Sequence, residues 1–280
     1  MKILFDQIKE YKTHLINEEK SRATTEKYVR DIEAFYEWLS GRDLTKELAL
    51  EYKAELIENY APTSVNSILA SLNGFFAYNE WHEIRLKNLK IQRRIFCQSE
   101  KELTKGEYER LLRAAKDKKN ERIYLVMQTI CATGIRVSEL SYITAESVRC
   151  GQAQVKLKGK IRMIILNKDL CRVLKKYMHE QGITTGCVFV TRNGNPLDRH
   201  GIWKSMKDLC ESAGVSREKV FPHNLRHLFA KTYYSLQKDI VRLADILGHS
   251  SINTTRLYTI ENGDEHRRQM EHLGLVCIRT

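Results

Sequence analysis

Two histidines, an arginine and a tyrosine within residues 221–260 have the types and spacing for chemistry on a phosphodiester. His223 and Arg226 are three positions apart, so a helix would place them on one face. His249 follows a Leu-Gly pair, where glycine can end a helix and redirect the chain. Tyr258 comes nine positions later, after a Ser-Ser-Ile-Asn-Thr-Thr segment that can cap a new helix. The order of these residues suits attack by the tyrosine hydroxyl on phosphorus.

Two segments further upstream add an arginine and a lysine to this set. Residues 131–140 read CATGIRVSEL, in which Arg136 closely follows a glycine and precedes a valine-led amphipathic turn. Residues 155–166 read VKLKGKIRMIIL, two short alternating runs on either side of Gly159. This alternation predicts a β-hairpin with Lys158 at its turn.

These motifs resemble those of the tyrosine recombinase (phage integrase) family. The resemblance is carried by ATGIRVSEL, the LKGK hairpin, HNLRH, LGHSSINTTRLY and the late tyrosine, in that order. It covers about residues 103–260, whereas the first hundred residues are similar only in general style. The complete ordered set Arg–Lys–His-x-x-Arg–His–Tyr makes the resemblance specific.

The resemblance implies transesterification at a DNA phosphate. Tyr258 would attack phosphorus and expel a deoxyribose 5′-hydroxyl, leaving a 3′-phosphotyrosine. Because the bond energy is kept in this ester, we expect no cofactor. The sequence agrees, because it has neither a Walker-type phosphate loop nor a dense carboxylate cluster for two-metal catalysis, so we also expect no metal site.

The resemblance also assigns the phosphate contacts. Arg136 and Arg226 would clamp the non-bridging oxygens, where negative charge gathers in the transition state. Guanidinium groups suit this role because they are planar, always charged and bidentate. His249 would donate a hydrogen bond to the same phosphate.

Two proton transfers complete the implied mechanism. Tyr258 has to lose its proton on attack, and His223 would accept it as general base. The leaving oxygen has to gain a proton, and Lys158 matches the family's general acid. Lys160 is the second choice, because the turn LKGKIR is shorter than the family's common form.

Charge and composition point to a polyanionic partner. Residues 1–100 carry 15 Lys and Arg against 16 Asp and Glu, whereas residues 101–280 carry 32 against 19, so the net charges are −1 and +13. We therefore expect double-stranded DNA as the partner of the second half. No apolar run is long enough for a membrane span, so we expect no membrane. The seven scattered cysteines favour a reducing compartment, and we expect a bacterial, cytoplasmic, nucleoid-associated protein.

Apolar periodicity in the first ninety residues predicts four short helices. The first covers residues 3–16, and the second starts at a cap on Thr24 or Thr25 and ends at Gly41. The third covers residues 46–59, and Pro62 opens the fourth. We expect residues 1–90 to form an all-α domain. In the resembled family it is the core-binding domain, which grips the far side of the duplex, and the alternative is a structural or protein-binding module.

A basic segment then separates this domain from the rest of the chain. Residues 84–95 contain five basic side chains and no acid, and we place a linker at 91–102. Arg93 and Arg94 are expected to lie along DNA phosphates, where each contact is sensitive to salt. A solvated basic face is the alternative interpretation.

Residues 103–280 are predicted to form the catalytic domain. Thr104 and Glu107 have the spacing of a capping box, and an apolar helix at 123–133 delivers Arg136. The remaining expected elements are strands at 152–158 and 161–166, a helix at 168–181, a buried strand at 188–190, a helix at 198–213 and a helix opened by Pro222. Arg199 and Lys204 on the 198–213 helix are candidate DNA contacts, with Lys160. The expected fold class is mainly α with a small antiparallel sheet, in two domains.

The function predicted from these features is site-specific recombination of DNA. The resemblance implies a dimer on each inverted-repeat site and a homotetramer on synapsed DNA, with possible accessory proteins. A short apolar cluster near the end of the chain is expected to dock on a neighbouring catalytic domain, or alternatively on its own: Met270, Leu273, Leu275 and Val276. The competing functions are a type IB topoisomerase and a non-catalytic DNA-binding accessory protein, although a binding protein has no need of the full catalytic set.

Overall fold

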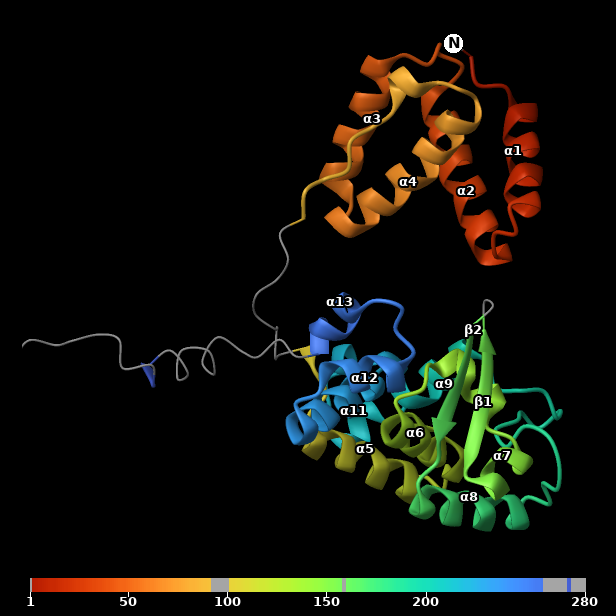
Figure 1. Cartoon of the computed structure of the whole chain (residues 1–280), viewed down its shortest axis with the longest axis vertical. Helices are drawn as coiled ribbons and strands as arrows, with labels where there is room; N and C mark the ends of the chain where they lie inside the picture. Colours follow the sequence, from red (N-terminus) through yellow and green to blue (C-terminus); the bar gives the residue numbers. More distant parts are fainter. Residues whose placement is uncertain (1, 92–100, 158–159, 259–270, 273–280) are drawn as a thin grey trace, which may run out of the picture. The chain divides into compact units, whose positions relative to one another are not determined.

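The computed structural model describes residues 2–91, 101–157, 160–258 and 271–272 (Figure 1). Its contacts divide the chain into two compact units, Met1–Arg93 and Arg94–Thr280. Within the described residues, no helix is both long and apolar enough to span a membrane. Arg93, Arg94, Lys158 and the apolar tail cluster lie outside the described residues. The domain limits predicted from composition therefore remain a prediction.

Four helices form the N-terminal unit, as the periodicity predicts. They are α1 (Phe5–Asn17), α2 (Arg22–Leu39), α3 (Lys46–Asn59) and α4 (Pro62–Tyr78), followed by the 3₁₀ turn η1 (His82–Ile84). Helix α2 packs against α1, α3 and α4 (Figure 1). Phe35, Phe75 and Phe76 are fully buried at the centre of its core, and burial of such rings drives the packing.

The second helix begins earlier than predicted. The Ser21 hydroxyl accepts a hydrogen bond from the backbone N–H of Thr24, so the cap of α2 is Ser21, three residues before Thr24, the first of the two predicted caps. A serine cap satisfies the same unpaired N–H as a threonine cap, and sequence alone did not decide between them. Pro62 opens α4 as predicted.

The C-terminal unit is mainly helical with one hairpin. Its helices are α5 (Lys105–Asp117), α6 (Glu121–Thr133), α7 (Ala145–Cys150), α8 (Lys168–Glu180), α9 (Arg199–Lys207), α10 (Cys210–Ala213), α11 (Pro222–Gln237), α12 (Ile240–Leu247) and α13 (Ile252–Thr255). Short 3₁₀ turns are η3 (Val137–Tyr142), η4 (Arg217–Lys219) and η5 (Arg256–Tyr258). The capping box of Thr104 and Glu107 is present at the start of α5.

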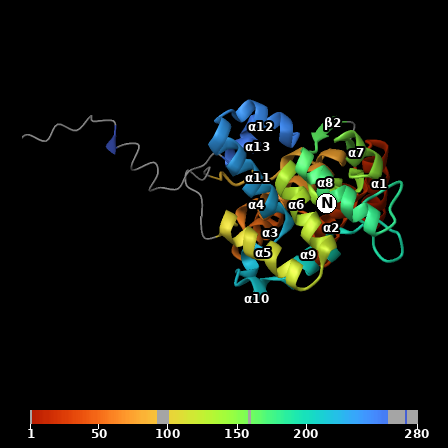
Figure 2. The same ribbon diagram turned by 90° about the horizontal axis from the view of Figure 1, so that it is seen from below.

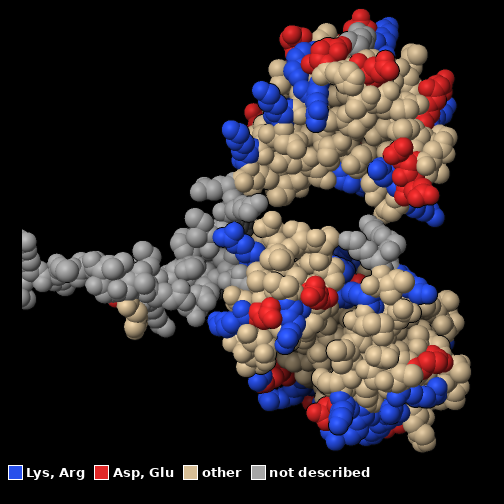
Figure 3. Space-filling model, in the orientation of Figure 1, with Lys and Arg blue, Asp and Glu red and all other residues tan. Residues whose placement is uncertain are grey.

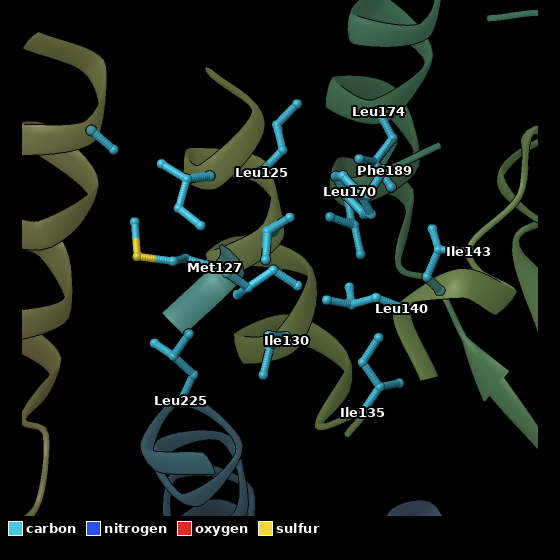
Figure 4. Packing of buried hydrophobic residues seen from close by; sticks show 14 of the residues in the cluster. Leu125, Met127, Ile130, Ile135, Leu140, Ile143, Leu170, Leu174, Phe189 and Leu225 are labelled. Atoms are coloured by element: carbon cyan, nitrogen blue, oxygen red, sulfur yellow. The ribbon is translucent and has the colours of Figure 1, made fainter. Parts of the chain in front are cut away.

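Helix α6 is the centre of this unit. It packs against α5, α8 and α11, and its buried side chains meet those of neighbouring elements in one apolar cluster (Figure 4). Met127 and Ile130 are fully buried in this cluster, together with Leu225 from α11. Gly134, with φ of 65°, ends α6 in the left-handed region, where a Cβ would also meet the ring of Phe229. The core therefore holds the end of α6 against α11.

The predicted hairpin forms an antiparallel pair of β1 (Gln152–Leu157) and β2 (Lys160–Ile165). Its register pairs Gln152 with Ile165 and Leu157 with Lys160. Val155 and Ile164 point into the core, which is the alternation expected for a sheet with one buried face.

Two other predicted elements are wrong. Val188 and Phe189 are buried, but this stretch has isolated bridges in place of a strand, Thr144 with Cys187 and Val190 with Pro196, because its neighbours contribute single backbone hydrogen bonds and no continuous ladder. The helix expected at 198–213 is divided into α9 and α10. The chain tightens there to a bond from Leu209 N to Met206 O of 3.2 Å, which is 3₁₀ geometry.

Candidate active site

Helix α11 presents three functional side chains on one face. Pro222 occupies its first turn, where the missing N–H is not needed. His223, Arg226 and His227 follow at positions i, i+3 and i+4, which share a face. Figure 2 shows α12 and α13 beside α11, and α11 contacts α12 and η5.

Arg226 lies at the centre of the site. Its side chain is among the largest fully buried ones, and the residue is 2% exposed. Nη1 donates to Gly134 O at 2.5 Å, Nη2 donates to Leu247 O at 2.8 Å, and Nη2 lies 2.9 Å from His249 Nε2. Within the described part of the chain, none of its hydrogen bonds goes to a carboxylate. The guanidinium is thus held by carbonyl ends of α6 and α12 and keeps its net charge for a ligand.

Burial, followed by the charge of Arg136, lowers the pKa of Arg226 to about 10. Tyr258 partly offsets this effect, which places its hydroxyl within electrostatic reach of the guanidinium. The group remains charged at neutral pH. A buried cation without an anionic partner is costly, so the site is preorganised for a negative ligand.

Arg136 lies beyond Gly134 and is more accessible than Arg226, with 39% of its side chain exposed. Its backbone N–H donates to Glu139 Oε2 at 2.7 Å, and its Nη1 donates to Glu139 Oε1 at 3.1 Å. Nη2 reaches Gly248 O at 3.5 Å. Glu139, which is buried, therefore directs one edge of the guanidinium and leaves the other edge toward the pocket described below.

His249 follows Gly248, whose φ of 64° ends α12. Arginine can only donate, so the 2.9 Å contact with Arg226 Nη2 makes His249 Nε2 an acceptor and places the proton on Nδ1. Nδ1 then donates to Thr255 Oγ1 at 2.8 Å. Burial, followed by the charges of Arg226 and Arg136, lowers the pKa of His249 to about 4. The imidazole is therefore neutral at pH 7.

Tyr258 packs between two imidazoles. Its ring is stacked on His249 at 5.8 Å between centroids and contacts His227 edge-on at 4.7 Å. The residue is 5% exposed and lies in a small apolar cluster with Ala230, Leu243 and Leu247. The late tyrosine thus lies, through α13 and η5, beside the same histidine that contacts the buried arginine.

His223 shares a pocket with both arginines. This pocket has a volume of 580 Å³, and its lining includes Arg136, His223, Arg226, Arg199 and Trp203. Burial, then the charges of Arg226, Arg136 and Arg199, lowers the pKa of His223, which favours the neutral form of the ring. Of the predicted DNA contacts on α9, Arg199 reaches this pocket.

The remaining predicted site residues are separate from this group or outside the described residues. Lys204 is an exposed side chain of α9 and does not line the pocket. Lys160 begins β2, but only its backbone is described, and Lys158, Arg93 and Arg94 lie outside the described residues. The choice between Lys158 and Lys160 as general acid stays open.

Three neighbours of the site were not singled out from the sequence. His227 contacts Tyr258, and its Nδ1 lies 3.6 Å from Glu102 Oε1. Glu139 and Arg162 form a buried ion pair beside Arg136. The sequence could have indicated His227, because it lies four positions after His223 and therefore on the same helix face. No local pattern indicates Arg162, because its partners Glu139 and Ile246 come from distant segments. Among the described residues no cluster of three or more His, Cys, Asp or Glu could hold a metal.

Comparison with known proteins identifies the family and the fold of this chain. Residues 101–265 match the phage integrase family, and residues 8–83 match the phage integrase N-terminal SAM-like domain. The tyrosine recombinase XerA of Pyrococcus furiosus is 29% identical over 280 residues, covering 96% of this chain and 94% of the relative. A lambda integrase (75–356) dimer bound to a COC′ core site has a TM-score of 0.74 at 19% identity and covers 91% of this chain and 94% of that one. A lambda integrase tetramer bound to a Holliday junction has a TM-score of 0.71 at 19% identity and covers 98% and 79%.

The chain has two helical units, and the second buries an arginine close to a histidine and a tyrosine. Both units match models of phage integrases. The chain belongs to the phage integrase family. The expected family, the fold class and the expectation of a tyrosine-type recombinase are confirmed.

Proposed function

We propose that this chain cuts and rejoins DNA at specific sites through a 3′-phosphotyrosine formed on Tyr258. The observation that carries the proposal is the buried Arg226, which has no carboxylate partner within the described part of the chain. Arg136, His223, His249 and Tyr258 surround it. Such a group of residues suits a pentavalent phosphate and the removal of one proton.

In the proposed step the Tyr258 oxygen forms a bond to phosphorus while the bond from phosphorus to the 5′-oxygen breaks. The tyrosine proton passes to His223, whose lowered pKa keeps the ring neutral and able to accept it. Arg136 and Arg226 hold the non-bridging oxygens. The 5′-oxygen takes a proton from a lysine of the hairpin, Lys158 or Lys160. Attack by a 5′-hydroxyl of a second strand reverses the step and completes strand exchange.

His249 is proposed to join the phosphate contacts when DNA binds. Without DNA, its Nε2 accepts from Arg226 and its proton lies on Nδ1. Phosphate oxygens bound to Arg226 would compete for that guanidinium edge. The proton of His249 would then move from Nδ1 to Nε2, so that Nε2 donates to the phosphate. The Thr255 hydroxyl, which accepts from Nδ1 without DNA, would donate to it instead.

Covalent trapping tests the nucleophile. Wild-type protein incubated with an end-labelled, nicked duplex should give an adduct that survives boiling in detergent and maps to Tyr258. Tyr258→Phe removes one oxygen, so it should bind DNA with near-normal affinity and form no adduct. Tyr233→Phe is the matched control, because Tyr233 packs beside the same cluster and should still allow the adduct. A label on any other tyrosine would show that the assignment is wrong.

Assembly is the second part of the proposal. We place a dimer on each inverted-repeat site and a homotetramer on synapsed DNA, with support from the solved lambda integrase dimer and tetramer on DNA. The C-terminal unit also has an apolar pocket of 430 Å³, whose lining includes Tyr108, Cys131, Val173 and Leu228. The apolar tail of a neighbouring copy is its proposed occupant. The proposed cellular location is the bacterial nucleoid.

Truncation and substrate choice test this assembly. A chain that ends at Asn262 should still cleave a single site but should lose synapsis and recombination of two sites. Wild-type protein should recombine two short inverted-repeat sites. Relaxation of supercoiled DNA without recombination would instead support a topoisomerase, and full recombination by the truncated chain would remove the role of the tail.

A further inference from the structure

The 3₁₀ turn η3 holds both strands of the hairpin. Glu139 accepts a hydrogen bond from Arg162 Nη2 in β2, and the Tyr142 hydroxyl donates to Lys156 O in β1 at 2.5 Å. Both contacts lie near the hairpin turn, where the register pairs Lys156 with Ile161. The residue that directly precedes η3 is Arg136. One short turn therefore connects the proposed phosphate clamp to both strands of the hairpin, the second of which begins at Lys160.

Of the two residues that bond η3 to the hairpin strands or receive such a bond from them, Arg162 and Tyr142, Arg162 makes the more extensive contacts. Its side chain is 13% exposed, although it projects from a two-stranded sheet. Nη1 donates to Ile246 O at 2.6 Å, near the end of α12. A Cβ on Gly248 would lie 2.5 Å from Arg162 Cδ, so the side chain passes directly against the turn before His249. Nε is buried and has no acceptor among the described residues.

The ion pair also acts on Arg136. Glu139 is 1% exposed and shares its two carboxylate oxygens between Arg162 and both the backbone and side chain of Arg136. Apolar contacts alone could hold the hairpin on the core, and burying charged groups is costly. The hydrogen bonds of Glu139 add something that apolar contacts do not: they fix the position of β2 relative to the guanidinium of Arg136.

We infer that Arg162 and Tyr142 are positioning residues, which hold the lysine-bearing hairpin at the distance from Arg136 needed to protonate the leaving oxygen. The inference rests on the proposed function. It predicts that these residues matter for the departure of the leaving group and much less for attack by Tyr258. Neither residue needs to touch DNA.

A change of leaving atom separates these two steps. With the normal substrate, the bond from phosphorus to the 5′-oxygen breaks and the oxygen takes a proton from lysine. When sulfur replaces that bridging oxygen, the bond from phosphorus to sulfur breaks and a thiolate leaves without a proton. A thiol has a pKa of about 8.5, so its anion is stable enough to depart unaided. The sulfur substrate therefore bypasses the general acid and anything that only positions it.

The experiment measures single-turnover adduct formation by full-length protein on nicked duplexes with oxygen or sulfur at the scissile position. Arg162→Lys should slow the oxygen substrate by at least about tenfold, part of the roughly 10²–10⁴-fold that positioned proton transfer contributes. Tyr142→Phe, which removes one hydroxyl, should slow it by about threefold or more. Tyr142→Phe should cleave the sulfur substrate within about twofold of wild type, whereas Arg162→Lys, whose partner Glu139 also bonds Arg136, should lose several-fold less on sulfur than on oxygen.

The control is Arg149→Lys. Arg149 also donates to a backbone carbonyl, Thr184 O at 2.6 Å, and this bond joins α7 to the segment after α8 and not to η3, so the change should leave both substrates unaffected. Equal losses on oxygen and sulfur would overturn the inference, because they would place Arg162 and Tyr142 in the clamp or the fold. If Arg162→Lys fails to fold, Tyr142→Phe alone decides. An adduct formed by Tyr258→Phe would overturn the proposed function itself, and this inference with it.

Discussion

Two buried charged side chains, Asp31 in the N-terminal unit and Arg226 in the C-terminal unit, are held in opposite ways. In the N-terminal unit the Asp31 carboxylate, 7% exposed, accepts from Lys27 Nζ at 2.5 Å and from the Ser71 hydroxyl at 2.8 Å. The charges cancel within the unit. In the C-terminal unit the Arg226 guanidinium is held by two carbonyls and a neutral imidazole. A buried charge that is neutralised stabilises one arrangement of helices, whereas one that is left uncompensated binds an ion of opposite charge.

The surfaces follow the same division. The net charge is −1 over residues 1–100 and +13 over residues 101–280. On the face drawn in Figure 3, acidic and basic side chains are interspersed on the N-terminal unit, whereas Lys and Arg gather along the lower edge of the C-terminal unit. The excess of positive charge supports the electrostatic part of DNA binding. The N-terminal unit would then add shape and position more than charge.

The largest expected effect concerns the uncompensated charge. Arg226→Gln should lower the rate of adduct formation by about 10²–10³-fold, or about 3–4 kcal/mol, because the clamp loses its charged donors. Thermal stability should change much less, since the same change removes a buried cation. The measurement is a single-turnover cleavage assay beside a melting curve. Collapse of the fold with unchanged specific activity would show that Arg226 is structural.

The second prediction separates the units. A fragment of residues 101–280 should fold, because it has its own core, and should bind DNA weakly through its net charge of +13. The full chain should bind at least about tenfold more tightly, because linked modules bind at high effective concentration. A gel-shift titration of both at several salt concentrations measures this. Equal affinities would contradict a clamp formed by two units.

The third prediction is the counterpart of the first in the N-terminal unit. Asp31→Asn should lower the free energy of unfolding by about 1–3 kcal/mol, because Lys27 loses its anionic partner and Ser71 donates to a neutral oxygen instead of a charged one. Cleavage by the folded protein should be unaffected. Chemical denaturation and the adduct assay together test this contrast with Arg226→Gln. A large loss of cleavage with unchanged stability would show that Asp31 takes part in function and is not only structural.

The smallest effect is on stability as pH falls. The folded-state pKa of His249 is about 4, below its ordinary value, so the unfolded chain binds the proton first. The contribution of His249 to stability is complete above about pH 6.5 and is lost as pH falls toward 4. His249→Gln should therefore make the decrease in Tm between pH 7.5 and 5 shallower. His179→Gln, a change at an exposed histidine of α8, should leave that decrease as in wild type.

Local signals predicted the elements that carry the site. The capping box at Thr104, the prolines at 62 and 222, and the helix-ending Gly134 and Gly248 all act within one turn of chain. Residues 188–190 show where such signals fail. A short buried apolar run has the same pattern whether or not a partner strand lies beside it.

The amino-acid sequence by itself determined the order of the catalytic motifs, the helices and hairpin that bear them, and the excess of positive charge in the second half. Only the tertiary structure decided that Arg226 bonds to Gly134, 92 residues away, and that Arg162 bonds to Glu139 and Ile246. It also brought His227 against Tyr258. The physical reason is that helix caps and hairpin registers depend on neighbours a few residues apart. A bond between distant segments depends on how α6, α11 and α12 pack, and many sequences with the same local pattern could pack differently.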